Sequence, residues 1–207
     1  MKNLKLLLVF MLLSNIITSQ NYFLEKYEPY NNSILSPEEF LGYEIGFQHT
    51  RHDQIVSYLT YLSSVSDKAD LIKYGKTHEG RNLVILTISS KNNLNRLGEI
   101  QKEHLKNTIP GVTVTSNEDL PIIINLGYGV QGNEPSSSEA ALLTAYTLVS
   151  SKSKKIEKFR QNSVVFIDPT INPDGRDRHT QWANQNKSIN LVADEYDSEH
   201  NEAWPRG

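Results

Sequence analysis

The sequence contains no cysteine. Disulfide bonds, thiol catalysis and cysteine-bound metal sites are therefore excluded. An excess of charge of one sign is also lacking, because 21 Lys and Arg stand against 24 Asp and Glu, a formal net charge of −3. This balance gives no reason to expect nucleic acid or an anionic membrane surface as a partner. The signatures of zincin proteases (His-Glu-x-x-His), phosphate-binding loops and serine hydrolases (Gly-x-Ser-x-Gly) are absent as well.

What is present is the composition of an ordinary globular protein. Of 207 residues, 38% are hydrophobic and 22% are charged, which is enough for one domain with a sizeable core. We expect residues 1–19 to be a leader, residues 20–47 an irregular lead-in rich in Tyr, Asn, Pro and Glu, and residues 48–207 the main domain.

The N-terminus holds the one long apolar run. Lys2 and Lys5 precede the apolar stretch 6–13, and a small residue, Ser19, ends the segment. This layout is typical of a secretory signal peptide cut after Ser19, so we expect a secreted or periplasmic protein with no membrane contact once the signal is removed. The run is short for a membrane span. The alternative is a buried or membrane-anchoring helix.

Helix and strand patterns begin after the lead-in. Ser36-Pro37 can start a short helix, since Pro is tolerated in the first turn. A longer helix is predicted from Thr50, because four apolar residues share one face at i, i+3, i+4 and i+7: Ile55, Tyr58, Leu59 and Leu62. Alternating apolar residues and turn glycines predict strands over 71–74 and 82–88. The spacing of Leu94, Leu97 and Ile100 predicts a further helix.

A strand–helix–strand unit follows. The apolar stretch 122–126 predicts a strand buried on both faces, and 164–167 predicts a second strand. Between them, Ser136 and Glu139 have the spacing of a capping box that opens a helix. In this order the two strands should be parallel, with a right-handed crossover.

The loops after these two strands should meet at one edge of the sheet, because ligand sites in open α/β sheets lie beyond the carboxyl ends of the strands. Gln131 and Glu134 lie in the first loop, and Asn172-Pro-Asp-Gly175 lies in the second. We therefore predict that residues 131–134 and 172–175 share a rim.

Four segments resemble the zinc carboxypeptidase family, in order and spacing. Gly75-Lys-Thr-His-Glu-Gly-Arg81 is similar to its opening hairpin. Gly132-Asn-Glu-Pro135 with 138–140 resembles its metal-binding turn, and 168–175 resembles its Asn-Pro-Asp-Gly turn. The segment 36–52 (SPEEFLGYEIGFQHTRH) is similar to the start of a subgroup of large secreted bacterial members.

The resemblance implies two zinc ligands in this chain. The family's turn carries His-x-x-Glu; here Glu134 is present and Gln131 replaces the expected His. Imidazole nitrogen suits zinc, whereas the neutral Gln amide oxygen is a weak donor, so zinc binding by this chain is expected to be weak. The plain alternatives are that Glu134 is a surface carboxylate near a helix start and that Gln131 only hydrogen-bonds in its loop. The third ligand and the acid/base Glu of the family would lie beyond Gly207, so no catalytic residue is expected within this chain.

Two arginines are candidates for substrate binding. A carboxypeptidase needs a guanidinium for the terminal carboxylate of its substrate, since the planar fork binds it in two places. Arg176 and Arg178 directly follow the second turn. The alternative is an ordinary ion pair with Asp174 or Asp177.

The fold that follows is α/β, with a mixed, largely parallel sheet and helices on both faces, incomplete at its C-terminal end. The resemblance implies zinc-dependent hydrolysis of C-terminal peptide bonds in peptides or proteins, although we expect this truncated chain alone to be inactive. A non-catalytic pseudo-peptidase that binds peptides or glycopeptides is one alternative. An amidoacid deacylase of the same superfamily is another, against which the secretory leader and the segment 36–46 argue. A truncated product that folds poorly is a third.

Overall fold

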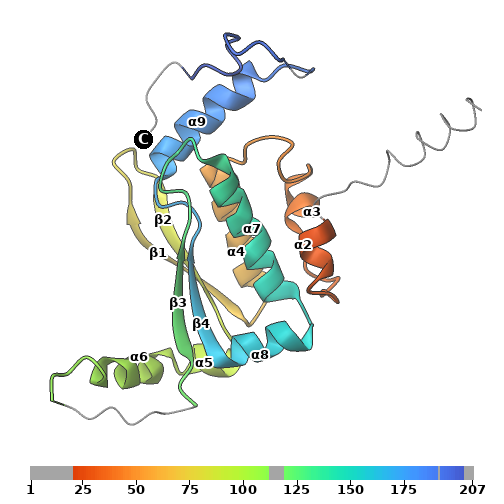
Figure 1. Cartoon of the computed structure of the whole chain (residues 1–207). Coiled ribbons are helices and arrows are strands. Elements are labelled where there is room, and N and C mark those ends of the chain that lie inside the picture. Colours follow the sequence, from red (N-terminus) through yellow and green to blue (C-terminus); the bar gives the residue numbers. More distant parts are fainter. Residues whose placement is uncertain (1–20, 112–118, 191, 203–207) are drawn as a thin grey trace, which may run out of the picture.

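The computed structural model describes residues 21–111, 119–190 and 192–202. The expected leader, residues 1–19, lies outside this range. The described residues form helices and strands in a mixed order along the chain (Figure 1): α2 (Asn21–Glu25), α3 (Pro37–Leu41), α4 (His52–Val65), β1 (Ala69–Lys76), β2 (Asn82–Ile88), α5 (Lys91–Asn95), α6 (Leu97–Lys106), β3 (Ile122–Gly127), α7 (Pro135–Ser150), α8 (Lys154–Asn162), β4 (Ser163–Asp168) and α9 (Pro173–Asn186).

The four strands form one sheet in the order β1-β2-β4-β3. β3 and β4 are parallel in continuous register from Ile122↔Ser163 to Gly127↔Asp168, as the strand–helix–strand unit predicts. β1 pairs with β2, and β2 with β4, in antiparallel fashion. The α/β class and the mixed sheet are therefore confirmed, with one parallel and two antiparallel pairings rather than a largely parallel arrangement.

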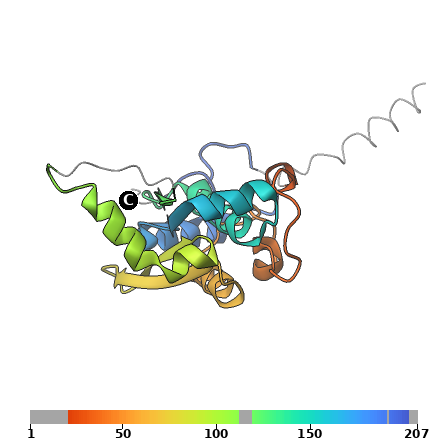
Figure 2. The ribbon, with the colours of Figure 1, turned by 90° about the horizontal axis from the view of Figure 1, so that it is seen from below.

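Helices α4 and α7 pack against each other and against the sheet to form the core (Figures 1 and 2). The predicted apolar face of α4 is fully buried, with Ile55, Tyr58, Leu59 and Leu62 each at 0% exposure. On the sheet side the core takes Leu86 and Ile88 of β2 and Val165 and Ile167 of β4. Burial of this kind stabilises the fold by about 1.5–3 kcal/mol per large aliphatic side chain. The spacing of these apolar residues in the sequence therefore predicted the buried face of α4 correctly.

Strand β3 departs from its prediction. Its mainly apolar sequence suggested burial on both faces, yet Ile122 is 58% exposed and Ile123 is 44% exposed. The physical reason is position, since β3 is the edge of the sheet and has β4 as its one described neighbour. An apolar sequence shows that a strand is suited to burial, but it does not show how many neighbouring strands or helices cover that strand.

The start of α7 also differs. The predicted capping box of Ser136 and Glu139 does not form, because the helix begins at Pro135 with Glu134 as its N-cap residue. Glu139 instead lies buried in the second turn and bonds to Thr50. Proline favours the first helical position, and the N-cap is Glu134 rather than Ser136, so the helix starts two residues earlier than the serine pattern suggests.

The lead-in packs onto the domain. Ser36 caps α3 in a capping box with Glu39, as its sequence indicates. Ile34 is 4% exposed within the core, and the ring of Tyr30 stacks on that of Tyr146 at 5.0 Å between centroids. Among the described residues, no helix has the length and apolar character needed to cross a membrane.

Candidate functional site

The loops that follow β3 and β4 lie side by side. The amide of Tyr128 donates to Asp168 (2.9 Å), that of Ile171 to Tyr128 (2.8 Å), and that of Asn172 to Gly129 (3.0 Å). Backbone hydrogen bonds thus join the two loops directly beyond strands β3 and β4. We call the turn of residues 131–135 and the turn of residues 172–175 together the rim.

Gly132 and Gly175 show how closely the two turns of the rim approach. A Cβ atom on Gly132 would lie 2.1 Å from the carbonyl carbon and 2.6 Å from the Cα of Gly175. Only a residue without a side chain allows this approach, because backbone atoms cannot move aside as a flexible side chain can. The predicted convergence of residues 131–134 and 172–175 is confirmed.

The two predicted metal ligands lie on the rim with exposed side chains. Glu134 is the N-cap residue of α7, and its amide donates to the carbonyl of Gln131 at 3.2 Å. Asn172 caps α9 from the facing turn, where its side chain accepts from the amide of Gly175 (2.9 Å). The rim is therefore built from the N-termini of two helices, each of which favours negative charge nearby.

The fit of zinc to these residues is incomplete. Glu134 offers the hard anionic oxygen that zinc accepts, whereas Gln131 offers a neutral amide. Among residues 21–111, 119–190 and 192–202, no three His, Cys, Asp or Glu side chains are arranged to hold a metal ion. The described donor set therefore falls short of the three protein ligands of a catalytic zinc site.

Arg176 lies beneath the rim and is 1% exposed. Its Nη2 donates to Glu139 Oε1 (2.7 Å) and to the carbonyl of Thr50 (2.8 Å), its Nε to the same carbonyl (3.0 Å), and its Nη1 to the carbonyl of Pro135 (2.9 Å). Burial lowers the pKa of the Arg176 guanidinium, and the neighbouring Glu139 carboxylate opposes this effect. The guanidinium holds α9, α7 and the segment before α4 together.

Glu139 completes this buried pair. It is 7% exposed and also accepts from the Thr50 amide (2.7 Å) and the Thr50 hydroxyl (2.8 Å). Arg176 therefore forms its ion pair with Glu139, and the alternative pairing with Asp174 or Asp177 is wrong. Arg178, two residues on, is exposed.

Arg81, rather than Arg176, forms ion pairs with Asp174 and Asp177. Its Nη1 lies 2.7 Å from Asp174 Oδ1 and its Nε lies 2.6 Å from Asp177 Oδ2, and it also pairs with Glu79. Thr77 and the amide of Glu79 bond to Asp174 from the same hairpin. The β1–β2 hairpin thereby fixes the first turn of α9, and so the second half of the rim. Arg81 was not singled out from the sequence, although the hairpin motif that contains it was.

Two histidines lie beside the buried pair. The His49 and His179 rings are 5.3 Å apart, and His179 Nδ1 is 3.5 Å from Glu202. Burial, then His179, Arg176 and Lys187, lower the pKa of His49 to about 4. Burial lowers the pKa of His179 as well, against the opposing effect of Glu202. His200 has its Nε2 at 2.8 Å from the carbonyl of Val192.

A tyrosine–aspartate hydrogen bond links two strands of the sheet next to the rim. The hydroxyl of Tyr74 donates to Asp168 Oδ2 at 2.6 Å, across from β1 to the end of β4. Burial raises the pKa of Asp168, and burial together with this bond raises the pKa of Tyr74 to about 12. The pair keeps β1 and β4 together where the second loop leaves the sheet.

Comparison with protein families gives a match to the model described as "Zinc carboxypeptidase" over residues 55–206. Comparison with curated proteins gives no significant match. Solved structures with a similar fold include thrombin activatable fibrinolysis inhibitor, at 16% identity and a TM-score of 0.47, covering 63% of this chain and 27% of that one. Carboxypeptidase A from Helicoverpa armigera has 18% identity, a TM-score of 0.45, and coverages of 75% and 31%. The metallo-carboxypeptidase from Burkholderia cenocepacia has 14% identity, a TM-score of 0.44, and coverages of 64% and 29%.

The chain thus spans about a third or less of the length of these structures. With TM-scores below 0.5, these likenesses carry no weight of their own, and the family assignment rests on the match over residues 55–206.

Proposed function

This chain belongs to the zinc carboxypeptidase family, and we propose that its rim is one part of a metallocarboxypeptidase site that acts on the C-terminal peptide bond of peptides or proteins. The observation that carries the proposal is the close approach of the two turns at Gly132 and Gly175. This contact brings a carboxylate, Glu134, and two helix N-termini to one exposed edge. We further propose that this chain alone hydrolyses no peptide.

Gln131 is the reason for expecting no turnover. An amide oxygen in place of an imidazole nitrogen weakens one of the two proposed ligands, and no three metal-binding side chains come together in the described part of the chain. When bound in a complete site, zinc polarises the scissile carbonyl and activates water. The described residues do not complete such a site, so we derive no reaction step from it.

The test is a zinc titration of three variants at position 131. We expect Gln131→His to bind zinc at least about tenfold more tightly than the unmodified chain, or about 1.4 kcal/mol. Gln131→Asn keeps an amide and should not gain. Adding Glu134→Gln to Gln131→His should remove the gain. Equal affinity of the His and Asn variants would contradict the metal-turn assignment, and chelator-sensitive hydrolysis of a blocked dipeptide by the unmodified chain would contradict the proposed inactivity.

A pseudo-peptidase that holds peptides without cutting them is the second candidate. The neutral Gln131 on an otherwise intact rim favours it, because the two turns keep their contact without a complete ligand set. Of the two arginines, we propose Arg178 for the substrate carboxylate, since Arg176 is buried and donates to three partners already. Arg178→Met should weaken binding of a blocked dipeptide with a free carboxylate and leave its C-terminal amide unaffected. Equal effects on both peptides would exclude this role.

Secretion is part of the proposal and rests on the sequence of residues 1–19. Replacing Leu8 and Leu12 in the apolar run by Asp should retain the protein in the cytoplasm, because a signal peptide needs an uninterrupted apolar segment. Mass spectrometry of exported protein should find an N-terminus at residue 20. An exported protein that still begins at Met1 would contradict the cleavage.

A further inference from the structure

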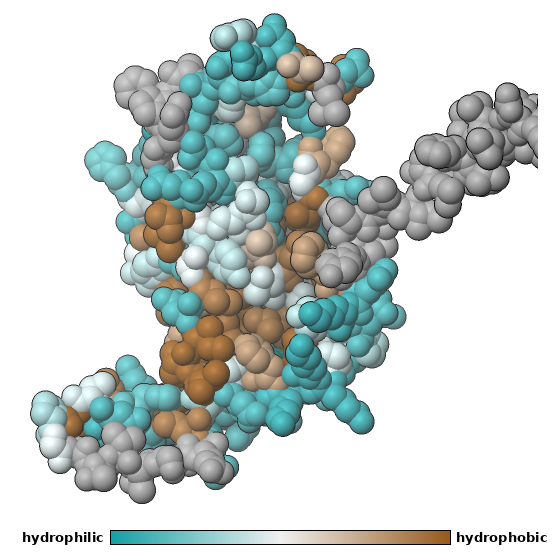
Figure 3. All heavy atoms as spheres, in the orientation of Figure 1, coloured by the Kyte–Doolittle hydropathy of each residue, from teal (hydrophilic) through white to brown (hydrophobic). Residues whose placement is uncertain are grey.

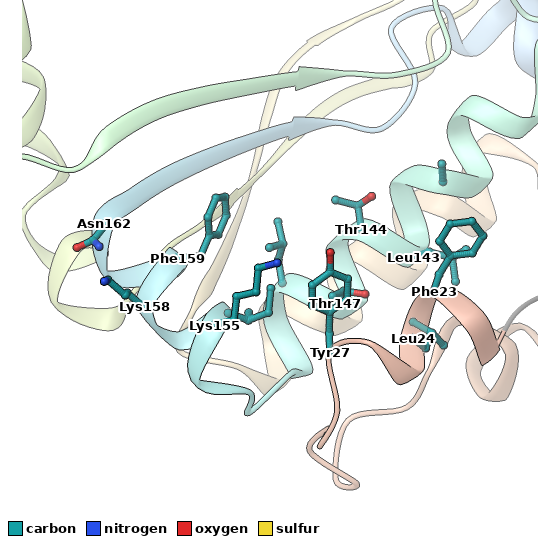
Figure 4. Close-up of a pocket in the computed structure, with 13 residues that line it drawn as sticks. Phe23, Leu24, Tyr27, Leu143, Thr144, Thr147, Lys155, Lys158, Phe159 and Asn162 are labelled. Carbon is teal, nitrogen blue, oxygen red and sulfur yellow. The ribbon is translucent and has the colours of Figure 1, made fainter.

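A groove lies between α2, α7 and α8 (Figure 4). Its volume is about 710 Å³, within the range of cavities that bind small organic ligands. Leu143 of α7, Phe159 of α8 and Phe23 of α2 contribute apolar walls. None of the rim residues takes part in it, so the groove is independent of the function proposed above.

The lining of the groove is apolar with positive charge on one wall. Thirteen residues line it; two of them, Lys155 and Lys158, are cationic, and none is Asp or Glu. Both lysines come from α8, where Lys158 lies near Asn162. Phe23 and Leu24 come from α2 and Tyr27 from the turn after it, and Lys155 Nζ lies over the Tyr27 ring, 5.7 Å from its centroid (Figure 4). A ligand that matches this lining has a long apolar part and one anionic group.

One side of α7 forms the floor of the groove. Ala140, Leu143, Thr144 and Thr147 recur at i, i+3, i+4 and i+7 and all line the groove. The opposite face of the same helix is buried in the core through Leu142, Ala145 and Val149. Figure 3 shows apolar side chains gathered across the middle of this side of the molecule.

We propose that this groove binds a long-chain carboxylate of the fatty-acid type. The carboxylate lies against Lys155 and Lys158, and the hydrocarbon chain lies along Leu143 toward Phe23. Charge favours an anionic amphiphile over a neutral one, because two lysines and no Asp or Glu line the groove, and a carboxylate there would be attracted by both cations. The other polar groups of the lining belong to Thr144, Thr147, Tyr27 and Asn162.

The test measures binding of dodecanoate and tetradecanoate to the full chain by calorimetry, with the methyl ester of tetradecanoate as a neutral analogue. We expect one site per chain. Two further methylenes should tighten binding about fifteenfold, since each buried methylene adds about fourfold, or about 0.8 kcal/mol. The methyl ester should bind at least about tenfold more weakly than the acid.

A lysine pair outside the lining provides the matched control. Lys155→Ala with Lys158→Ala should weaken tetradecanoate binding at least about tenfold, whereas Lys152→Ala with Lys154→Ala removes the same charge without touching the lining and should have little effect. All four side chains are exposed, so circular dichroism should show unchanged folding. Equal binding by the two double variants, equal binding of acid and ester, or no saturation below the micelle concentration would overturn the proposal. Binding of an amphipathic helical peptide to the groove, with none of tetradecanoate, would overturn it in favour of a protein partner.

Discussion

Replacing Arg176 by methionine should destabilise the protein more than any surface change. Methionine keeps an unbranched stem of similar length at this buried position and removes the guanidinium. Glu139 would then remain buried at 7% exposure without its cation. The carbonyl of Pro135 would lose its 2.9 Å donor, and that of Thr50 would lose two donors.

The expected loss is about 3–5 kcal/mol, the range found when one partner of a buried ion pair is removed. The lower end is the better estimate, because Glu139 keeps its two bonds from Thr50. A domain of this size is stable by about 5–15 kcal/mol, so the loss is a large share of the total. Replacing both members, Arg176→Met with Glu139→Leu, should cost less than the single change, since no buried charge remains.

Urea unfolding followed by circular dichroism measures these differences. Arg178→Met is the matched control, because it removes the same group from the same helix at an exposed position, where changes are usually within about 0.5 kcal/mol. A loss below about 1 kcal/mol for Arg176→Met, or a double variant less stable than the single one, would refute the reasoning.

Three further predictions concern the rim and its supports. Gly132→Ala should lower the free energy of unfolding by at least about 1–3 kcal/mol, because its Cβ would overlap the backbone of Gly175. Gly98→Ala is the control, since open space surrounds Gly98, and it should be neutral or stabilising. Equal urea midpoints for the two variants would contradict the close packing. Arg81→Lys should lower the free energy of unfolding by about 1–2 kcal/mol, since one ammonium cannot reach three carboxylates. Arg51→Lys changes an exposed ion pair and should lower it by less than about 0.5 kcal/mol. Similar losses in the two variants would refute the network. His49 resists protonation in the folded state down to about pH 4, while the unfolded chain takes the proton near 6.5. Stability should therefore be complete above pH 6.5 and fall by up to about 3 kcal/mol toward pH 4, and His49→Gln should flatten this slope in urea titrations; an unchanged slope would count against it.

The parts of the fold set by local pattern could be predicted from sequence. The face of α4, the strands β1, β2 and β4, and the parallel pairing of β3 with β4 all follow from periodicity and from the order of the elements. The convergence of the two turns followed from the same order. It required no knowledge of which side chains would meet.

The parts set by long-range contacts could not be predicted. The sequence made Arg176 a candidate for the substrate carboxylate or for an ion pair with Asp174 or Asp177. Its actual partners include Thr50 and Glu139, which are 126 and 37 residues away. Glu139 looked like a capping residue for the same reason. The exposure of Ile122 and Ile123 depends on the number of strands beside β3, which the strand's own sequence does not encode.

These long-range contacts also separate the shape of the rim from its donor chemistry. Gly132 packs on Gly175, Arg176 holds the carbonyl next to Glu134, and Arg81 holds Asp174 at the facing turn. None of these contacts involves the side chain of Gln131, which is exposed. A histidine at position 131 would therefore meet a turn that is already formed, so the gain in zinc affinity expected of Gln131→His should come without any change in the free energy of unfolding of the metal-free protein. A variant that gained zinc affinity only with a large change in that stability would mean that the side chain at position 131 helps to hold the turn together.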